Sequence, residues 1–282
     1  FSTGAIGVPV EKRIAYLREL RPDVGALNMG SMNYAKYSRR RKDFVFKAVF
    51  ENSFDTIIEF ITAMNELGIQ PEHECFDAGH VANLDPFLDM GMLEPPLQIS
   101  LVMGVTGGIR PVPKNVGFMS EQIPGGPEGP NNWQVIGVSR DQWKLLAASL
   151  NLGGNVRAGL EDNLYLPDGE MARSNGELIA KARQMAEDIG RRAATVAEAR
   201  EMLGLKERSQ ALSAVDWAAR GRSSPWPRAS ARRSRRRSRG RPVGFSLTIG
   251  LRARPEPIVG GAYSETPVLE DLNETGAAVS VV

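Results

Sequence analysis

The chain has 282 residues, of which 42% are hydrophobic and 24% are charged, a composition typical of globular domains. A single cysteine excludes an internal disulfide framework and a multi-cysteine zinc site, and no apolar run approaches the ~20 residues of a membrane-spanning helix. The net charge of +2 conceals an asymmetry, because residues 208–282 hold 13 arginines, no lysine and 6 acidic residues, whereas residues 1–207 carry a net charge of −5. We therefore expect a domain over residues 1–206 and a separate basic tail over residues 207–282.

Short apolar runs alternate with longer amphipathic runs along the domain. The first residues, FSTGAIGVP, have no signal-peptide pattern and read as the end of a strand, and with the single cysteine they favour a cytoplasmic setting. The later elements are predicted, in chain order, as a helix over 10–20, a strand over 24–29, a helix over 54–67, a strand over 74–78, a helix over 81–90, a strand over 97–103, a helix over 114–122, a strand over 133–138, a helix over 140–150, a strand over 156–160, and helices over 174–189 and 196–203.

The repeated order of strand and helix predicts a mostly parallel sheet covered by helices. Five strands and part of a sixth fall short of the eight in a (β/α)₈ barrel. A doubly wound open sheet is the alternative, which is disfavoured because no G-x-G-x-x-G fingerprint follows an early strand. The pattern therefore predicts an α/β protein, a (β/α)₈ TIM barrel that lacks about the first two βα units, followed by a disordered Arg-rich tail.

The candidate site lies at the carboxyl ends of the strands, where parallel α/β folds place their working residues. Glu161 and Asp162 end the strand over 156–160, and we expect their side chains to point to opposite sides, with Arg157 on the side of Glu161. A buried arginine needs a carboxylate partner. The spacing fits a catalytic or metal-binding group, and it fits a structural ion pair with Asp162 as a helix N-cap equally well.

Glu74 is an acid inside an apolar strand, which fits an active-site acid or an ion pair with an arginine of the barrel. We expect His73 to face solvent, His80 to cap the following helix, and Cys75 to pack on the side opposite Glu74. A metal site made of Glu74 and the two histidines is disfavoured, because their spacing matches no standard zinc pattern. The glycines over residues 104–108 fit a loop that admits a phosphate or thioester, although a tight turn explains them equally well.

Four segments together resemble the beta-keto acid cleavage enzymes: ALNMGSMNY at 26–34, ECFDAGHVANL at 74–84, MGVTGGI at 103–109 and GGNVRAGLEDNLYL at 153–166. The resemblance extends over about residues 1–206. It implies a (β/α)₈ barrel with a divalent metal, usually zinc. It also implies a reaction that joins a β-keto acid with acetyl-CoA and gives acetoacetate and a new acyl-CoA.

The resemblance further implies roles for individual residues. Glu161 matches a zinc ligand, Arg157 and Asp162 match residues that support deprotonation and the rearranging carbonyl, and Glu74 matches a further active-site acid. The segments that hold the keto acid match Ser2, Thr3, Asn28 and Ser31. The other two zinc ligands form an H-x-H motif on the family's second strand, which we expect on a part that precedes this chain. We therefore expect poor zinc affinity and little activity of this chain alone.

The basic tail is predicted to be disordered, and two alternative functions stay open. A run such as ASARRSRRRSRGRP cannot bury enough apolar surface to fold, and a shifted reading frame would explain its Lys-free composition. The alternative functions are a different barrel enzyme that uses carboxylates and magnesium, and a nucleic-acid-binding protein that acts through the tail. Nucleic acid is disfavoured because no aromatic residues interleave with the arginines. We expect small-molecule partners, a homo-oligomer and no membrane contact.

Overall fold

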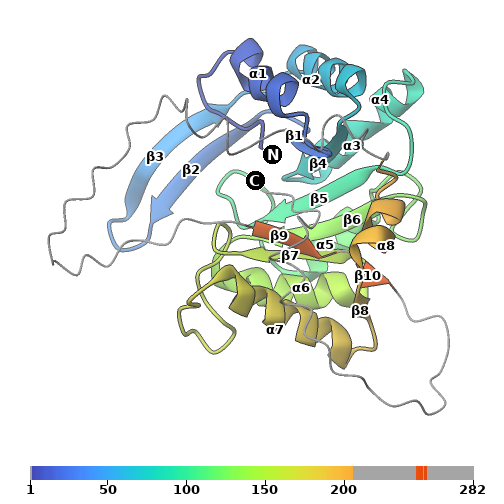
Figure 1. Ribbon diagram of the computed structural model, residues 1–282. Coiled ribbons are helices and arrows are strands. Elements are labelled where there is room, and N and C mark those ends of the chain that lie inside the picture. Colours follow the sequence, from blue (N-terminus) through green and yellow to red (C-terminus); the bar gives the residue numbers. More distant parts are fainter. Residues whose placement is uncertain (1, 206–245, 250, 253–282) are drawn as a thin grey trace, which may run out of the picture. The chain divides into compact units, whose positions relative to one another are not determined.

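A computed structural model of the chain describes residues 2–205, 246–249 and 251–252. Within these residues, the main sheet has six strands in the order β1-β4-β5-β6-β7-β9 (Figure 1). The first five strands of that order pair in parallel, and β9 pairs antiparallel with β7. Their bounds are Val24–Asn28 (β1), Gln70–Cys75 (β4), Gln98–Met103 (β5), Asn132–Gly137 (β6), Asn155–Gly159 (β7) and Ser246–Ile249 (β9).

The helices follow the strands as the sequence pattern predicts. Their bounds are Val10–Leu20 (α1), Phe54–Leu67 (α2), Ala78–Ala82 (α3), Leu84–Asp89 (α4), Pro113–Ser120 (α5), Gln142–Asn151 (α6), Asn175–Asp188 (α7) and Val196–Met202 (α8), with a 3₁₀ turn at Ser139–Asp141 (η1). Two short strands, Arg192–Ala193 (β8) and Leu251–Arg252 (β10), pair antiparallel beside them. Among the described residues, the helices are too short or too polar to cross a bilayer.

Capping residues fix several helix ends. The side chain of Ser53 accepts a hydrogen bond from the Thr56 N–H at the start of α2, as predicted from the sequence. Thr195 and Glu198 form a complete capping box at α8, which confirms that prediction. At α7, Ser174 accepts from the Glu177 N–H, but the Glu177 carboxylate accepts from the N–H of Arg173, one residue earlier than the box requires.

Alternation along the parallel strands divides the sheet into two faces. We call one the helix face: Leu27, Cys75, Ile99, Leu101 and Val135, all buried in one apolar cluster with residues of the helices. We call the other the polar face: Asn28, Glu72, Glu74, Ser100, Gln134 and Arg157, all buried as well. The strand register joins the polar face, since Glu74 pairs with Asn28 on one side and with Ser100 on the other, and Ser100 pairs with Gln134.

The region around β4 differs from the sequence prediction. The strand begins at Gln70, four residues before the predicted start, and its register places His73 beside Leu27 and Ile99 on the helix face. His73 is therefore fully buried, and the prediction that it faces solvent was wrong. Asp77 accepts from the His80 N–H and begins α3, so His80 lies inside a helix that it was expected to cap. Cys75 is buried on the helix face, as predicted.

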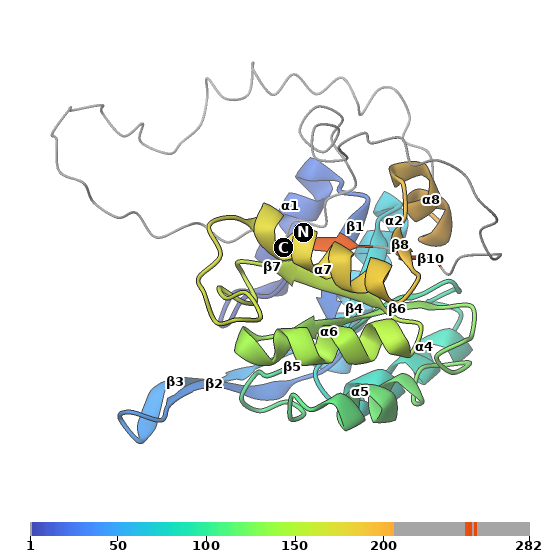
Figure 2. The ribbon, with the colours of Figure 1, turned by 90° about the horizontal axis from the view of Figure 1, so that it is seen from below.

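The sequence analysis missed a long β-hairpin after β1. Strands Met32–Ser38 (β2) and Asp43–Phe50 (β3) pair with each other as a two-stranded sheet, joined by the turn Arg39-Arg40-Arg41-Lys42. We call residues 32–50 the arm. In both views the arm extends away from the main sheet (Figures 1 and 2).

The predicted α/β class with a parallel sheet is confirmed. The described strands do not show the closure of a barrel, because β1 and β9 end the strand order; Ser2 adds a single parallel bridge to Ala26 on β1. The predicted absence of about two βα units is not tested. The predicted disordered tail lies outside the described residues, apart from the short strands β9 and β10.

Candidate functional site

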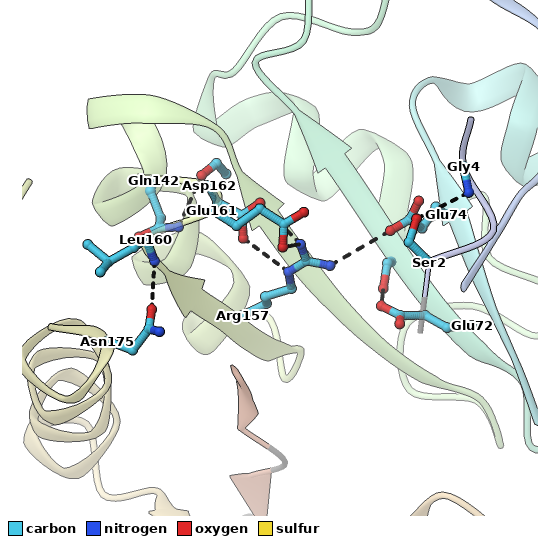
Figure 3. Close-up of polar contacts among 12 residues, drawn as sticks. Ser2, Gly4, Glu72, Glu74, Gln142, Arg157, Leu160, Glu161, Asp162 and Asn175 are labelled. Carbon is cyan, nitrogen blue, oxygen red and sulfur yellow. Dashed lines mark hydrogen bonds and ion pairs between the residues drawn. The ribbon is translucent and has the colours of Figure 1, made fainter. Parts of the chain in front are cut away.

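The centre of the candidate site is the side chain of Arg157, which extends from β7 on the polar face (Figure 3). Its Nε lies 3.0 Å from Oδ2 of Asp162 and its Nη2 lies 3.2 Å from Oδ1, so Asp162 binds the guanidinium with both oxygens. The same Nη2 lies 3.1 Å from Oε2 of Glu161, and Nη1 lies 3.7 Å from Oε1 of Glu74. The guanidinium of Arg157 thus contacts three acidic side chains, one from β4 and two from the turn that follows β7.

Most of the charged side chains around Arg157 are buried, and burial disfavours their charged forms. The side chains of Arg157, Glu74 and Asp162 are buried, while that of Glu161 keeps 36% of its surface exposed. Burial opposes the charge on Arg157, but Asp162 and Glu74 together raise the pKa of its guanidinium, which stays protonated. Three carboxylates share this one cation, so the group favours a proton on one of them.

Glu74 is the carboxyl group that holds this proton. Burial raises the pKa of Glu74 to about 8, and the neighbouring carboxylate of Glu72 raises it further than Arg157 lowers it. Burial also raises the pKa of Glu161. At neutral pH the site therefore presents a protonated Glu74 that can donate a hydrogen bond, beside the ion pair of Arg157 with Asp162.

A second polar network, which the sequence analysis missed, lies beside Glu74 on the polar face. The Ser100 hydroxyl donates to Oε1 of Glu72 at 2.6 Å, and the Gln134 side-chain amide donates to the same oxygen at 2.9 Å and to Ser100 Oγ at 2.9 Å. These residues come from three neighbouring strands. A sequence signal is present for Ser100 and Gln134, which are polar residues between apolar neighbours in their strands. Glu72 gives no such signal, because it lies among other polar residues of β4.

Two expectations about the strand end at β7 need correction. Glu161 and Asp162 both contact Arg157, so their side chains do not point to opposite sides. The reason is that β7 ends at Gly159 and the chain turns there, where strand alternation no longer applies. The reading of Asp162 as a helix N-cap was also wrong, because the next helix, α7, begins at Asn175.

The residues expected to hold the keto acid lie at the β1 edge. Asn28 pairs with Glu74 across β1 and β4, so it is adjacent to the Arg157 group. Ser2 bridges Ala26, and its hydroxyl oxygen accepts from the Gly4 N–H at 3.1 Å. The Thr3 hydroxyl donates to the Ala26 carbonyl, and Ser31 Oγ accepts from the Asn52 N–H at 2.8 Å. Each hydroxyl thus has a role in local structure, and substrate binding by these residues stays a prediction.

Apolar side chains cover the carboxyl ends of the strands next to the site. Met32 and Phe50, from the two ends of the arm, pack with Phe76, Val102 and Ile136 in one buried cluster. Ile136 is the strand partner of Arg157, so the cluster borders the guanidinium. The base of the arm therefore places buried apolar side chains beside the strand position that carries Arg157.

The glycines after β5 serve close packing. A Cβ on Gly107 would lie 1.7 Å from the carbonyl oxygen of Asn33, and one on Gly108 would lie 2.7 Å from that of Phe76. Thr106 also bridges Ala35 of the arm. The alternative of a tight turn accounts for this loop, because chain segments occupy the space that the missing side chains leave.

The described residues do not by themselves form a zinc site. Within residues 2–205, no group of three or more His, Cys, Asp or Glu side chains is placed to hold a metal. His73 lies on the helix face, with Nδ1 3.3 Å from Sδ of Met29, and burial lowers its pKa to about 3. The His80 ring packs against Gly30. Neither histidine shares a group with Glu161, the ligand that the family resemblance implies.

The fold and the site together define a class, the α/β enzymes whose charged groups lie at the carboxyl ends of parallel strands. A family model of beta-keto acid cleavage enzymes matches residues 1–205. The chain therefore belongs to the beta-keto acid cleavage enzyme family.

Individual relatives agree with this assignment. The chain is 34% identical over 204 residues to the 3-keto-5-aminohexanoate cleavage enzyme of Fusobacterium nucleatum, covering 72% of this chain and 69% of that protein. It is 33% identical over 216 residues to the 3,5-dioxohexanoate:acetyl-CoA acetone transferase of Paraburkholderia graminis, covering 72% and 70%. The fold resembles the apo structure of ObcA with a TM-score of 0.58 at 19% identity, over 72% of this chain and 50% of that one. The chain thus spans about half the length of the solved structure that it matches.

Proposed function

We propose that this protein cleaves a β-keto acid with acetyl-CoA as the second substrate, giving acetoacetate and a new acyl-CoA. The observation that carries the proposal is the buried Arg157, bound by Asp162, Glu161 and Glu74 in a chain of this family. Two relatives whose names specify acetyl-CoA as a substrate, from Paraburkholderia graminis and Cupriavidus necator, support the choice of co-substrate.

The reaction needs a base, a cation and a hydrogen-bond donor. The methylene group of a β-keto acid lies between two carbonyl groups, and Asp162 is the carboxylate that we assign to remove its proton. Arg157 holds Asp162 in place through two hydrogen bonds and offsets the negative charge that develops on the substrate.

Glu74 takes a different part because it carries a proton at neutral pH. Its hydroxyl can donate to a substrate oxygen as negative charge develops there, while the ionised Asp162 acts as the base. The apolar cluster beside Arg157 strengthens these interactions by excluding water. The two carboxyl groups thus take separate roles because their surroundings differ.

The metal and the location stay predictions. The family resemblance implies that Glu161 is a zinc ligand, and its partly exposed carboxylate is already bound to Arg157. No step above depends on a metal, because the described residues supply too few ligands. A magnesium-dependent reaction, nucleic-acid binding through the tail and a cytoplasmic location also stay predictions.

The test is formation of both products by the purified full-length protein. Low turnover above the enzyme-free background is sufficient, because the sequence predicts little activity of the chain alone. A set of β-keto acids is incubated with acetyl-CoA, and acetoacetate and the new thioester are measured by mass spectrometry. Asp162→Asn keeps the shape of the side chain and removes the base, so we expect turnover to fall by roughly 10²–10⁴-fold. Asp188→Asn, an exposed position on α7, is the matched control and should retain activity. Equal turnover by Asp162→Asn, or acetoacetate from none of the acids, would contradict the proposal.

A further inference from the structure

The arm exposes large apolar side chains on both of its strands. Its outer part carries five large apolar side chains that are 42–53% exposed: Tyr37, Phe44, Val45, Phe46 and Val49. Among the described residues, the base of the arm packs on the rest of the chain through Met32, Tyr34 and Phe50, and Ala35 bridges Thr106. A two-stranded hairpin is marginally stable in water, and an exposed apolar patch of this kind marks a contact with another protein.

The arm is also strongly basic. Residues 32–50 hold six basic residues and one acid, and four consecutive cations, Arg39 to Lys42, form the turn at its tip. All four are exposed. The partner of the arm should therefore present acidic groups around apolar ones. The chain's own tail does not meet this requirement, because residues 208–282 carry a net charge of +7.

The chain itself carries a surface with these properties. Residues 51–109 hold ten acidic residues and no lysine or arginine. We call the exposed residues of α2, α4 and their flanks the acidic helix surface: the acids Glu51, Asp55, Glu59, Glu66, Asp85, Asp89 and Glu94, with the apolar side chains Phe54 and Met90.

The parts of this surface lie together. Phe54 of α2 contacts Phe87 of α4 with ring centroids 6.1 Å apart, and the Asn65 side chain donates to the Met92 carbonyl at 2.9 Å. Phe54 and Met90 are 56% and 59% exposed, so apolar area is available between the acids. The surface thus matches the arm in its charge and in its exposed apolar groups.

We propose that the arm docks on the acidic helix surface of a second copy of this chain. The arm extends away from its own main sheet in both views, so a second copy is the source of the matching surface (Figures 1 and 2). A reciprocal exchange gives a closed two-fold dimer, in which each copy supplies one arm and one acidic helix surface. The proposal is independent of the reaction, because none of its residues belongs to the Arg157 group.

A charge exchange tests the proposal on the full-length protein. The arm variant is Arg40→Glu with Arg41→Glu, and the surface variant is Asp55→Lys with Asp85→Lys. The control is Lys12→Glu with Arg18→Glu, two exposed positions on α1 that give the same charge change as the arm variant. Self-association is measured by sedimentation at micromolar concentration, and thermal unfolding confirms that each variant is folded.

The expected pattern has three parts. The wild type and the control associate, and both the arm variant and the surface variant associate roughly 100-fold more weakly, because like charges then meet in the interface. An equal mixture of the arm and surface variants associates again, because both contacts of the mixed dimer then join opposite charges. A monomeric wild type would overturn the proposal, and so would an arm variant that associates like the control. Two folded variants that do not associate when mixed would also overturn it.

Discussion

The helix face and the polar face lie on the same strands, yet the helix face buries apolar side chains and the polar face buries charged and hydrogen-bonding ones. On β5, Leu101 packs in the large apolar cluster, while the adjacent residue Ser100 donates to the carboxylate of Glu72 on the other side of the sheet. Both side chains are almost completely buried. Leu101 contributes to stability because its apolar surface is removed from water. Ser100 instead binds a buried acidic group, whose removal from water costs free energy unless it is hydrogen-bonded.

The two faces therefore differ in how much their buried side chains contribute to stability and to function. The strand residues that define the helix face are uncharged, whereas the polar face buries Arg157 with three acidic side chains and has a further acid, Glu72, nearby. Replacing such a group with apolar residues of similar volume is often neutral or stabilising. The charged group is therefore better explained by chemistry than by stability.

Removal of Arg157 should give the largest effect. Arg157→Ala leaves Glu74 and Asp162 buried without their cation, so we expect a loss of about 3–5 kcal/mol in the free energy of unfolding. Product formation should fall by roughly 10²–10³-fold at a temperature where the variant is folded. Urea unfolding and product assays measure the two effects. Arg183→Ala, which breaks an exposed ion pair with Glu187, is the control and should change neither by much. An active Arg157→Ala variant would contradict the assignment.

A deletion on the helix face should separate stability from activity. Leu101→Ala should lower the free energy of unfolding by about 2–5 kcal/mol, because it removes a fully buried side chain and leaves a cavity. Turnover by the folded fraction should stay within about twofold, since Leu101 points away from Arg157. Chemical denaturation and kinetics on the same samples check this. A large loss of turnover without a loss of stability would show that the two faces are not separate.

The proton on Glu74 should appear as a pH dependence of stability. The pKa of Glu74 is about 8 in the folded chain and near 4.5 when unfolded, so the folded state binds the proton more tightly. Its contribution to stability is full below about pH 4.5 and is lost as the pH rises through 8. Glu74→Gln stays neutral and should therefore lose less stability than the wild type between pH 5 and 8. Denaturation of metal-free protein over this range measures the difference. Parallel pH profiles for the two proteins would mean that Glu74 is ionised at neutral pH.

The smallest effect should come from Ser100. Ser100→Ala removes the hydrogen bond to Glu72 but leaves the one from Gln134. We therefore expect the free energy of unfolding to fall by about 1–3 kcal/mol. The same measurement on Leu101→Ala, at the adjacent position, gives the direct comparison between the faces. No change in Ser100→Ala would indicate that Gln134 alone satisfies Glu72.

The sequence predicted the local features better than the long-range ones. The limits of α1 and α2 follow from apolar spacing, with a capping residue and a glycine to define α2. The meeting of Glu74 and Arg157 could not be derived from spacing, because 83 positions separate them and the order of strands brings them together. The side of His73 depended on where β4 begins, which propensity does not fix across Pro71 and Glu72. The arm was missed although two segments rich in aromatic and β-branched residues flank the polar turn over residues 39–42.

The most direct test of the account follows the carbon atoms of acetyl-CoA. Full-length protein is incubated with a β-keto acid and acetyl-CoA that carries ¹³C in its acetyl group, and the acetoacetate is examined by NMR. We expect ¹³C in the ketone half of acetoacetate and none in the carboxylate half, with formation lost in Arg157→Ala. Acetoacetate without the label, or labelled acetoacetate formed equally well by Arg157→Ala, would contradict the claim that the polar face carries out this reaction.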